Sequence, residues 1–330
     1  MMTELFSQML SIDSTSGRER DFALWLEKSL DAPRKTLHEV GDGTLNLLLG
    51  WGEPEIVFCT HMDTVPPYIA PVFDGGIVRG RGSCDAKGQI FSMYSACRAL
   101  AASGHDGFAL LLLSGEETGS FGAKAFSRTG FTAPYLVIGE PTDNCMVSAS
   151  KGTKSFDLHF TGKACHSGYP QYGRSAVDMF VDFMDELRAE DFGDDALLGG
   201  TTFNVGLLRS DNPQNILSPS LDCRLYFRTT FASDAKVCSY MDGLACPDVE
   251  VRSRGGDAPA EYLTLPGFRT APASFGSDAP HLTGFSHKMI CGPGSIMTAH
   301  RDNEQVAVKD LEEAIDNYIR IYENCDQRLR

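Results

Sequence analysis

The sequence lacks the surplus of basic residues that a nucleic-acid or anionic-membrane partner requires. Its 330 residues include 29 Lys and Arg against 44 Asp and Glu, which gives a formal net charge of −15. A basic surface is what attracts phosphate groups, so we exclude both classes of partner. Hydrophobic residues (42%) and charged residues (22%) are near the averages of a soluble globular protein, which excludes a disordered or fibrous chain.

Long hydrophobic runs are missing too. No run reaches the roughly 18 apolar residues that cross a bilayer. The first residues, MMTELFSQMLSIDSTSG, have neither the basic stretch nor the unbroken apolar stretch of a secretory leader, so we expect a cytoplasmic protein. Ten cysteines are present, but none forms a CxxC pair and several lie inside apolar runs. We therefore expect reduced, mostly buried thiols rather than a disulfide framework.

The chain is long enough for two domains, because single cores stop growing at about 250–300 residues. In the N-terminal half, helical and strand patterns alternate, which predicts an α/β domain with a mostly parallel sheet flanked by helices. The strand candidates are four short runs, at residues 45–49, 55–60, 108–114 and 135–139. They are apolar almost throughout, so we expect strands that are covered on both faces.

The pattern changes near residue 151, where alternating strands surround an amphipathic helix. We expect this helix to bury one stripe, made of Ala176, Val177, Phe180, Val181, Met184 and Leu187. The Gly-rich segment 253–262 is typical of a linker. The sequence therefore predicts an α+β domain at 151–254, inserted into a catalytic domain at 1–150 and 255–330. Another helix is expected over residues 16–30, with Ser14, Thr15 or Ser16 as its cap.

Acidic residues and a histidine directly follow three of the strand candidates: His61 and Asp63, Glu116 and Glu117, and Glu140. Ligands of open α/β sheets bind outside the carboxyl ends of the strands, so these side chains are expected to converge. Asp85 joins them from the turn GRGSCDAKG, which lacks the GxxxxGK[ST] spacing of a phosphate loop. A helix cap is the alternative role for Asp85.

This set of donors predicts a metal centre. Imidazoles and carboxylates without paired cysteines suit zinc or another divalent cation. Charge balance favours two ions, because two divalent cations would be neutralised by three carboxylates and a bridging hydroxide. One ion with three carboxylates would leave excess negative charge in a desolvated cleft, which is costly.

Seven segments in this order resemble the successive motifs of one family of enzymes: HMDTVPP, GRGSCDAKG, LLSGEETGS, VIGEPT, GKACHSGYP, GSDAP and GPGSIMTAHRDNEQV. The family is that of the di-zinc metallopeptidases and deacylases, which contains acetylornithine deacetylase, succinyl-diaminopimelate desuccinylase, aminoacylase and glutamate carboxypeptidase. The resemblance spans residues 61 to 304, most of the chain.

The resemblance implies five ligands for two zinc ions, with cobalt or manganese as substitutes. They are His61 and Glu140 on one ion, Glu117 and His300 on the other, and Asp85 as the bridge. It also implies that Asp63 orients the imidazole of His61. Glu116 would be the general base that takes a proton from the metal-bound water.

The same resemblance implies residues of the inserted domain that meet the substrate. His166 would stabilise the oxyanion across the interface of a homodimer. Asn204 and Arg228 would hold the substrate carboxylate, for which a planar guanidinium is well suited. The turn NILSP is one residue longer than the family pattern, which leaves Arg224 as the alternative to Arg228.

The resemblance is closest to acetylornithine deacetylase, so the expected reaction is removal of an acyl group from an N-acyl amino acid, with acetyl-lysine as another substrate. Glutamate at position 140 resembles the deacylases and carboxypeptidases, whereas the aminopeptidases of the family usually have aspartate there. The alternatives are desuccinylation of diaminopimelate, aminoacylase activity, and dipeptidase or carboxypeptidase activity. A non-catalytic relative that binds metal is the alternative from another class.

Overall fold

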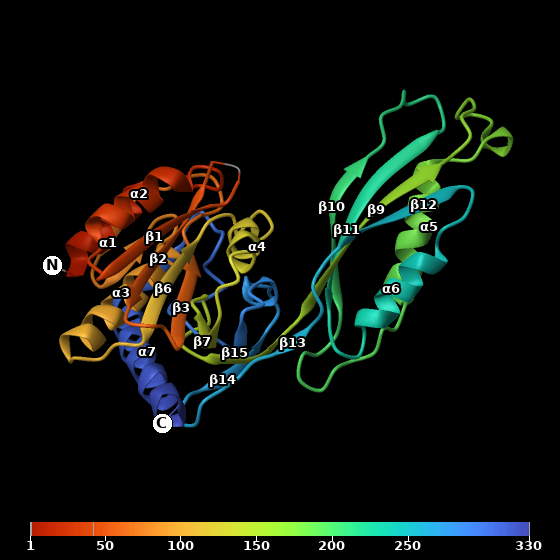
Figure 1. Cartoon of the computed structure of the whole chain (residues 1–330). Helices are drawn as coiled ribbons and strands as arrows, with labels where there is room; N and C mark the ends of the chain where they lie inside the picture. Colours follow the sequence, from red (N-terminus) through yellow and green to blue (C-terminus); the bar gives the residue numbers. More distant parts are fainter. Residues whose placement is uncertain (1, 42, 330) are drawn as a thin grey trace. The chain divides into compact units, whose positions relative to one another are not determined.

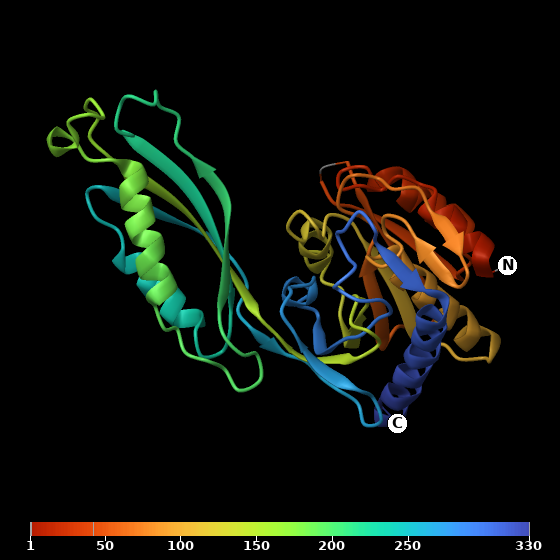
Figure 2. The ribbon, with the colours of Figure 1, turned by 180° about the vertical axis from the view of Figure 1, so that it is seen from behind.

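The computed structural model describes residues 2–41 and 43–329 and divides the chain into two compact units. The first unit comprises Met1–Ser148, Tyr262–Ala271 and Ser277–Arg330, and the second comprises Ala149–Glu261 and Pro272–Gly276. Figures 1 and 2 show the ribbon from opposite sides. The second unit thus extends past the expected 151–254 at both ends and takes in a short later segment.

The first unit is built on a six-stranded sheet. Its order is β1 (Arg34–Glu39), β2 (Leu45–Trp51), β6 (Phe108–Leu113), β3 (Ile56–His61), β7 (Ala133–Ile138) and β15 (Phe285–Ile290). The last four strands run parallel, while β2 pairs antiparallel with β1 and β6. Every residue of β3 and β6 is buried, which confirms strands covered on both faces. The predicted α/β class with a mostly parallel sheet is therefore confirmed.

Helices cover this sheet on both sides. On one side lie α1 (Met2–Leu10), α2 (Glu19–Ser29), α3 (Lys87–Ala102) and α7 (Val308–Leu329), and on the other lies α4 (Phe121–Ser127) (Figure 1). The helix α3 packs on β3 and β6 and also contacts α1 and α7. Its buried side chains, with those of α7, form one core with the central strands. Helix α1 was not expected from the sequence.

Shorter elements complete the first unit and the chain segments next to it. One small sheet contains β4 (Val72–Asp74), β5 (Ile77–Arg79) and β16 (Gln305–Ala307), and another contains β8 (Met146–Ser150), β13 (Ala260–Glu261) and β14 (Thr270–Ala273). A 3₁₀ turn, η2 (Ala279–His281), contacts α4.

The predicted caps of α2 have a different role. The residue before the helix is Arg18, and no side chain caps the helix there. The hydroxyl of Ser14 instead donates to the carbonyl oxygen of Met62 at 2.7 Å, and that of Ser16 donates to Asp63 Oδ2 at 3.0 Å. The cap prediction was wrong because the helix begins later, at Glu19, and the serines are used to hold the segment after β3.

The second unit is a four-stranded antiparallel sheet with two helices on one face (Figure 1). Its order is β10 (Thr202–Arg209), β11 (Ser220–Thr229), β9 (Gly152–Thr161) and β12 (Val249–Gly255). The helices are α5 (Ala176–Ala189) and α6 (Asp234–Gly243), and a short 3₁₀ turn, η1 (Pro170–Tyr172), precedes them. Alternate residues of β11 are buried against the helices, as the alternating pattern predicts.

The expected apolar stripe of α5 is partly wrong. Val177 is 37% exposed and Val181 is 48% exposed, whereas Phe183 is buried. The buried stripe passes through Ala176, Phe183 and two later residues, Met184 and Leu187. Positions 177 and 181 lie beside this stripe on the helix surface, so their apolar side chains face outward.

All ten cysteines are free, and six of them are buried, which confirms the expectation for the thiols. Among the helices of the described residues, none combines the length and the apolar character that crossing a membrane would require.

Candidate metal centre

Three adjacent parallel strands deliver the candidate ligands to one edge of the sheet. The strands β6, β3 and β7 lie side by side and point the same way. His61 is the last residue of β3. Glu116 and Glu117 follow β6 after two residues, and Glu140 follows β7 after one residue. Their convergence results from the parallel pairing of three apolar strands.

Asp85 lies between two histidines. Its Oδ1 is 3.0 Å from His61 Nε2, and its Oδ2 is 3.2 Å from His300 Nε2. His300 Nε2 is also 2.8 Å from Glu117 Oε1. Ligand atoms of His61, Asp85 and Glu117 all lie within 4.8 Å of one another. The structure therefore brings four of the five expected ligands into direct contact.

The alternative role of Asp85 as a helix cap is not what the structure shows. The residue before α3 is Ala86, and no side chain caps that helix. Both carboxylate oxygens of Asp85 face imidazoles instead. The Asp85 side chain thus belongs to the candidate metal centre.

The imidazole of His61 is held from behind by Asp63. Nδ1 lies 2.9 Å from the backbone carbonyl oxygen of Asp63 and 3.5 Å from its carboxylate Oδ1. In the neutral imidazole, an Nδ1–H that donates to a carbonyl leaves Nε2 without a proton, which is the form that binds a metal. The nearest acceptor for Nδ1 is therefore the main-chain carbonyl oxygen of Asp63, and the carboxylate lies farther away.

The carboxylate of Asp63 holds the segment after β6. It accepts hydrogen bonds from the backbone N–H of Glu116 at 3.0 Å, the backbone N–H of Glu117 at 3.1 Å and the hydroxyl of Ser16 at 3.0 Å. Asp63 is completely buried. One side chain therefore connects the histidine of β3 to the pair of glutamates after β6.

The carboxylates of the site favour positive charge on the two imidazoles, His300 and His61. Hydrogen bonds that the imidazole of His300 donates to the carboxylates of Asp85 and Glu117 raise its pKa to about 10. Burial alone would lower the pKa of His61, but Asp63 and Asp85 raise it well above its usual value. Burial alone would raise the pKa of Asp85, yet the two histidines hold it below its usual value.

The other buried acids of the site repel one another. Burial raises the pKa of Glu116 and of Glu140 well above the usual value, and neighbouring carboxylates add to the effect. Burial also raises the pKa of Asp278 to about 6, although a hydrogen bond with Ser120 opposes it. Its Oδ1 finds no hydrogen-bond partner among the described residues.

These residues fit a divalent metal. Every donor is a nitrogen or an oxygen, which is the chemistry of zinc and of other divalent ions with mixed ligands. A cation that replaces the imidazole protons would also relieve the repulsion among the buried acids. The described residues thus include a candidate metal site, while its donor set does not distinguish zinc from cobalt or manganese.

The three expected residues of the second unit are described within that unit. His166 is exposed on a loop, where its Nδ1 accepts the backbone N–H of Gly168 at 3.1 Å. Asn204 is exposed on β10, opposite Tyr226 of β11. The proposed roles of His166 and Asn204 toward the substrate stay predictions.

The two candidate arginines differ in their surroundings. Arg224 makes a two-pronged contact with Asp157, with Nε at 2.6 Å and Nη2 at 3.3 Å. Arg228 instead stacks over the ring of Tyr226, 4.9 Å from its centroid. Within the described residues no acidic side chain pairs with Arg228. An external carboxylate therefore finds the fork of Arg228 available and that of Arg224 occupied.

Several residues of the site were not singled out from the sequence. Glu304 and Arg81 form a buried ion pair behind Asp85, and Ser16 supports Asp63. Glu304, Arg81 and Asp278 all lie inside the motif segments quoted above, which was the only available signal. A single sequence does not distinguish a structural acid from a catalytic one.

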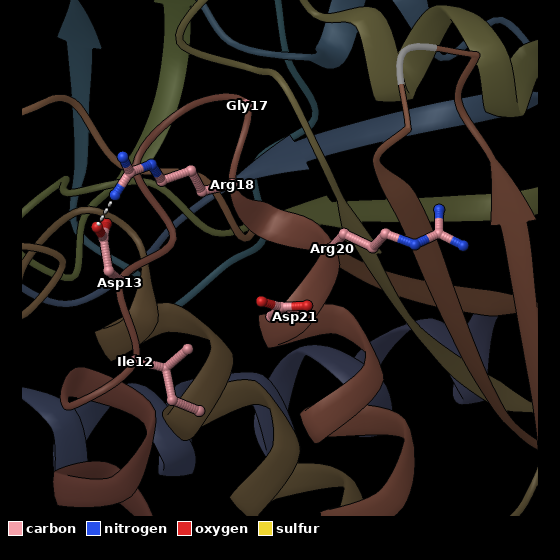
Figure 3. A pocket seen from close by; sticks show the side chains of 6 residues that line it. All are labelled: Ile12, Asp13, Gly17, Arg18, Arg20 and Asp21. Carbon is pink, nitrogen blue, oxygen red and sulfur yellow. Dashed lines mark hydrogen bonds and ion pairs between the residues drawn. The ribbon is translucent and has the colours of Figure 1, made fainter.

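A surface pocket of about 570 Å³ lies elsewhere on the first unit. Figure 3 shows its lining, in which Asp13 and Arg18 form an ion pair at 2.9 Å. The other lining residues are Ile12, Gly17, Arg20 and Asp21. None of them is an expected site residue, so this pocket does not mark the candidate metal centre.

A mostly parallel sheet with nitrogen and oxygen donors at its carboxyl edge is an arrangement that suits a metal-dependent hydrolase. Residues 57–324 match the sequence profile of Peptidase family M20/M25/M40. The chain belongs to this family and is a hydrolase that acts on amide bonds. This confirms the family that the seven motifs indicated.

Curated relatives cover most of the chain. A peptidase M20 domain-containing protein of Schizosaccharomyces pombe is 29% identical over 339 residues, which span 97% of this chain and 84% of the relative. A probable carboxypeptidase of Aspergillus flavus is 32% identical over 313 residues, which span 82% of this chain and 74% of the relative. Both names are peptidase names, and neither describes a deacetylase.

Solved structures share the fold. A tripeptidase of Staphylococcus aureus superimposes with a TM-score of 0.82 at 18% identity, covering 99% of this chain and 98% of the other. A dinuclear metal binding peptidase of the M20 family from Bacillus subtilis gives a TM-score of 0.69 at 12% identity, covering 96% and 95%. At such identities the likeness concerns the fold.

Proposed function

We propose that this chain is a di-zinc amidohydrolase that removes a small acyl group from an N-acyl amino acid, as acetylornithine deacetylase does. The observation that carries the proposal is the carboxylate of Asp85, whose two oxygens face two different imidazoles, those of His61 and His300. A carboxylate shared in this way is suited to bridge two cations.

In this proposal the two ions have separate ligands besides the bridge. His61 and Glu140 hold one ion, and Glu117 and His300 hold the other. When bound, the ions acidify a water molecule and polarise the amide carbonyl of the substrate. Cobalt or manganese would occupy the same donors, because the Asp, Glu and His side chains suit all three metals.

Glu116 is the proposed general base. The backbone N–H of Glu116 donates to Asp63, and its neighbour Glu117 contacts His300. Glu116 therefore lies next to the proposed ligands in the chain but is not itself a proposed ligand. In the reaction Glu116 takes a proton from the attacking water and delivers it to the leaving nitrogen. Adjacent glutamates thereby have different tasks.

The second unit supplies the proposed contacts to the substrate. Arg228 binds the free carboxylate of the amino-acid part through two parallel hydrogen bonds, with Asn204 as a further donor. Support for Arg228 over Arg224 comes from the Asp157 contact, which occupies Arg224. His166 of a second copy of the chain stabilises the oxyanion of the reacting amide.

A homodimer is part of this proposal. The strand β10 is an edge of its sheet, and two of its side chains, Leu207 and Leu208, are 45% and 55% exposed. The exposed Val177 and Val181 of α5 add apolar surface to the same unit. Exposed apolar residues beside a sheet edge are typical of a surface that pairs with another chain.

The names of the curated relatives favour a second candidate function, carboxypeptidase activity. Both reactions break an amide bond whose nitrogen belongs to an amino acid with a free carboxylate. They differ only in whether the other side is a small acyl group or a peptide. The proposed grip of Arg228 on the carboxylate serves both.

A substrate panel tests the proposal. The purified chain, loaded with zinc or cobalt, is assayed on N-acetylornithine, N-acetyl-lysine, N-succinyl-diaminopimelate and dipeptides, each with a free and an amidated carboxyl group. We expect turnover of the acetylated amino acids with a free carboxylate. Faster turnover of dipeptides would favour the carboxypeptidase, and metal binding without any turnover would identify a non-catalytic relative.

A further inference from the structure

A buried ion pair lies directly behind Asp85. Arg81 Nη1 is 2.6 Å from Glu304 Oε2, and the two side chains are 2% and 0% exposed. Arg81 comes from the turn before α3, and Glu304 comes from the segment between His300 and β16, so 223 residues separate them. Burying two charges is costly unless the surroundings offset the cost, and here both side chains form several hydrogen bonds besides the ion pair.

The carboxylate of Glu304 organises the backbone of the turn that ends in Asp85. Its Oε1 accepts hydrogen bonds from the backbone N–H groups of Gly82 at 3.0 Å, Cys84 at 3.1 Å and Asp85 at 3.0 Å. The turn needs such an acceptor, because Gly82, with φ of 83°, belongs to a tight loop whose N–H groups point inward. These hydrogen bonds thereby fix the backbone position of Asp85.

Arg81 connects the same turn to the segment of His300. Its Nη1 donates to the carbonyl oxygen of Arg301 at 3.2 Å, and its Nε donates to that of Pro67 at 3.2 Å. His300 itself has a positive φ of 62°, a conformation that persists only where neighbouring contacts determine it. The contact to Arg301 is immediately adjacent to this strained residue.

We infer that the Arg81–Glu304 pair positions Asp85 against His300, and that it thereby sets the geometry in which both metal ions would be held. This inference rests on the proposed di-metal function. The reason is that, among the described residues, the side-chain hydrogen bonds of the pair go to the turn of Asp85 and the segment of His300, with Pro67 as the one further partner. If the pair contributed only to stability, its hydrogen bonds would not be expected to go mainly to the segments that carry Asp85 and His300.

The test uses the full-length chain and cobalt chloride as the probe. Three variants are compared with the wild type: Glu304→Gln, Arg81→Lys and Ile321→Ala. Glu304→Gln keeps an acceptor for the three N–H groups but loses the charge that faces Arg81. Arg81→Lys keeps the charge but loses the fork. Ile321→Ala removes buried apolar volume from α7, at a residue that is not a candidate ligand, and is the control for lost stability alone.

The readouts are the visible absorption spectrum of bound cobalt and the metal affinity in competition with a chelator. We expect Glu304→Gln and Arg81→Lys to shift the spectrum and to weaken cobalt binding by about 10–100-fold, the usual effect of losing a group that orients ligands. Ile321→Ala should melt at a lower temperature with an unchanged spectrum and affinity. If Glu304→Gln or Arg81→Lys does not fold, the spectrum and affinity of the other variant are compared with those of the wild type and Ile321→Ala.

The outcomes separate this inference from the proposed function. If the wild type binds cobalt and both pair variants melt earlier yet keep its spectrum and affinity, the pair is structural only and the inference is wrong. If the wild type binds no divalent ion, the proposed function fails first, and the inference fails with it.

Discussion

The Oδ1 atom of Asp63 accepts a hydrogen bond of 3.0 Å from the backbone N–H of Glu116. Asp63 follows β3, and Glu116 follows the neighbouring strand β6. The proposed base is thus tied by its main chain to the residue that supports His61. A change at Asp63 is therefore expected to disturb the base and a ligand together.

Asp63→Asn should lower both metal affinity and turnover. Asn has nearly the same shape, but one carboxylate oxygen becomes an N–H₂ group, which cannot accept from the N–H of Glu116 or Glu117. We expect metal affinity to fall by about 10–100-fold, as measured by chelator competition. Asp74→Asn is the control, because Asp74 is exposed and its ion pair among the described residues is with Arg79 at the surface. Unchanged affinity in Asp63→Asn would contradict this role.

Glu116→Gln should separate metal binding from catalysis. The variant keeps the ligands but cannot accept a proton, so we expect a loss of about 10²–10⁴-fold in kcat with metal content unchanged. Metal content is measured by elemental analysis of the dialysed protein. Glu117→Gln is the comparison, because Glu117 contacts His300 and should lose metal as well as activity. A Glu116→Gln enzyme near the wild-type rate would refute the mechanism.

Removal of metal should destabilise the protein. Five acids of the site, Asp63, Asp85, Glu116, Glu117 and Glu140, lie close together with little exposure to water, and a bound cation offsets their repulsion. At a free-metal concentration of about 100 times the dissociation constant, binding stabilises by about 2.7 kcal/mol. Thermal unfolding with a chelator, then with zinc restored, measures the effect. A melting temperature that changes neither with the chelator nor with added zinc would argue against the metal site.

Arg228→Met should raise KM for substrates with a free carboxylate more than it lowers kcat. The guanidinium binds the carboxylate equally in the ground state and the transition state, so its loss mainly weakens binding. Substrates whose carboxyl group is amidated should respond little. Arg224→Met is the matched control on the same strand, since Arg224 is held by Asp157. The reverse pattern would assign the carboxylate to Arg224.

A mixing experiment tests whether His166 acts across a dimer. His166→Ala and Glu116→Gln should each be inactive alone. If His166 serves the partner's site, mixed dimers contain one site with both residues intact, and activity returns. Leu208→Arg should block the return, because it places a charge on the exposed part of the β10 edge. No recovery in dimers shown by sedimentation to be mixed would place His166 in its own subunit.

The sequence was sufficient to predict four strands of the first unit's sheet and to predict nitrogen and oxygen donors at their ends. The runs that became β2, β3, β6 and β7 are apolar almost throughout, and short runs of that kind are typical of strands buried on both faces. The apolar pattern was less reliable for predicting which side of a helix is buried, because Val177 and Val181 of α5 face outward.

Tertiary structure decided how the site is held together. Asp85 and His300 are far apart in sequence, as are Arg81 and Glu304, so no local pattern relates them. Ser16 was expected to cap a helix and instead supports Asp63, since the later start of α2 leaves its hydroxyl beside the end of β3. The sequence alone predicted which side chains are candidate metal ligands. Only the folded chain decided which atoms face one another, because buried charges take their positions from partners that the fold alone brings near.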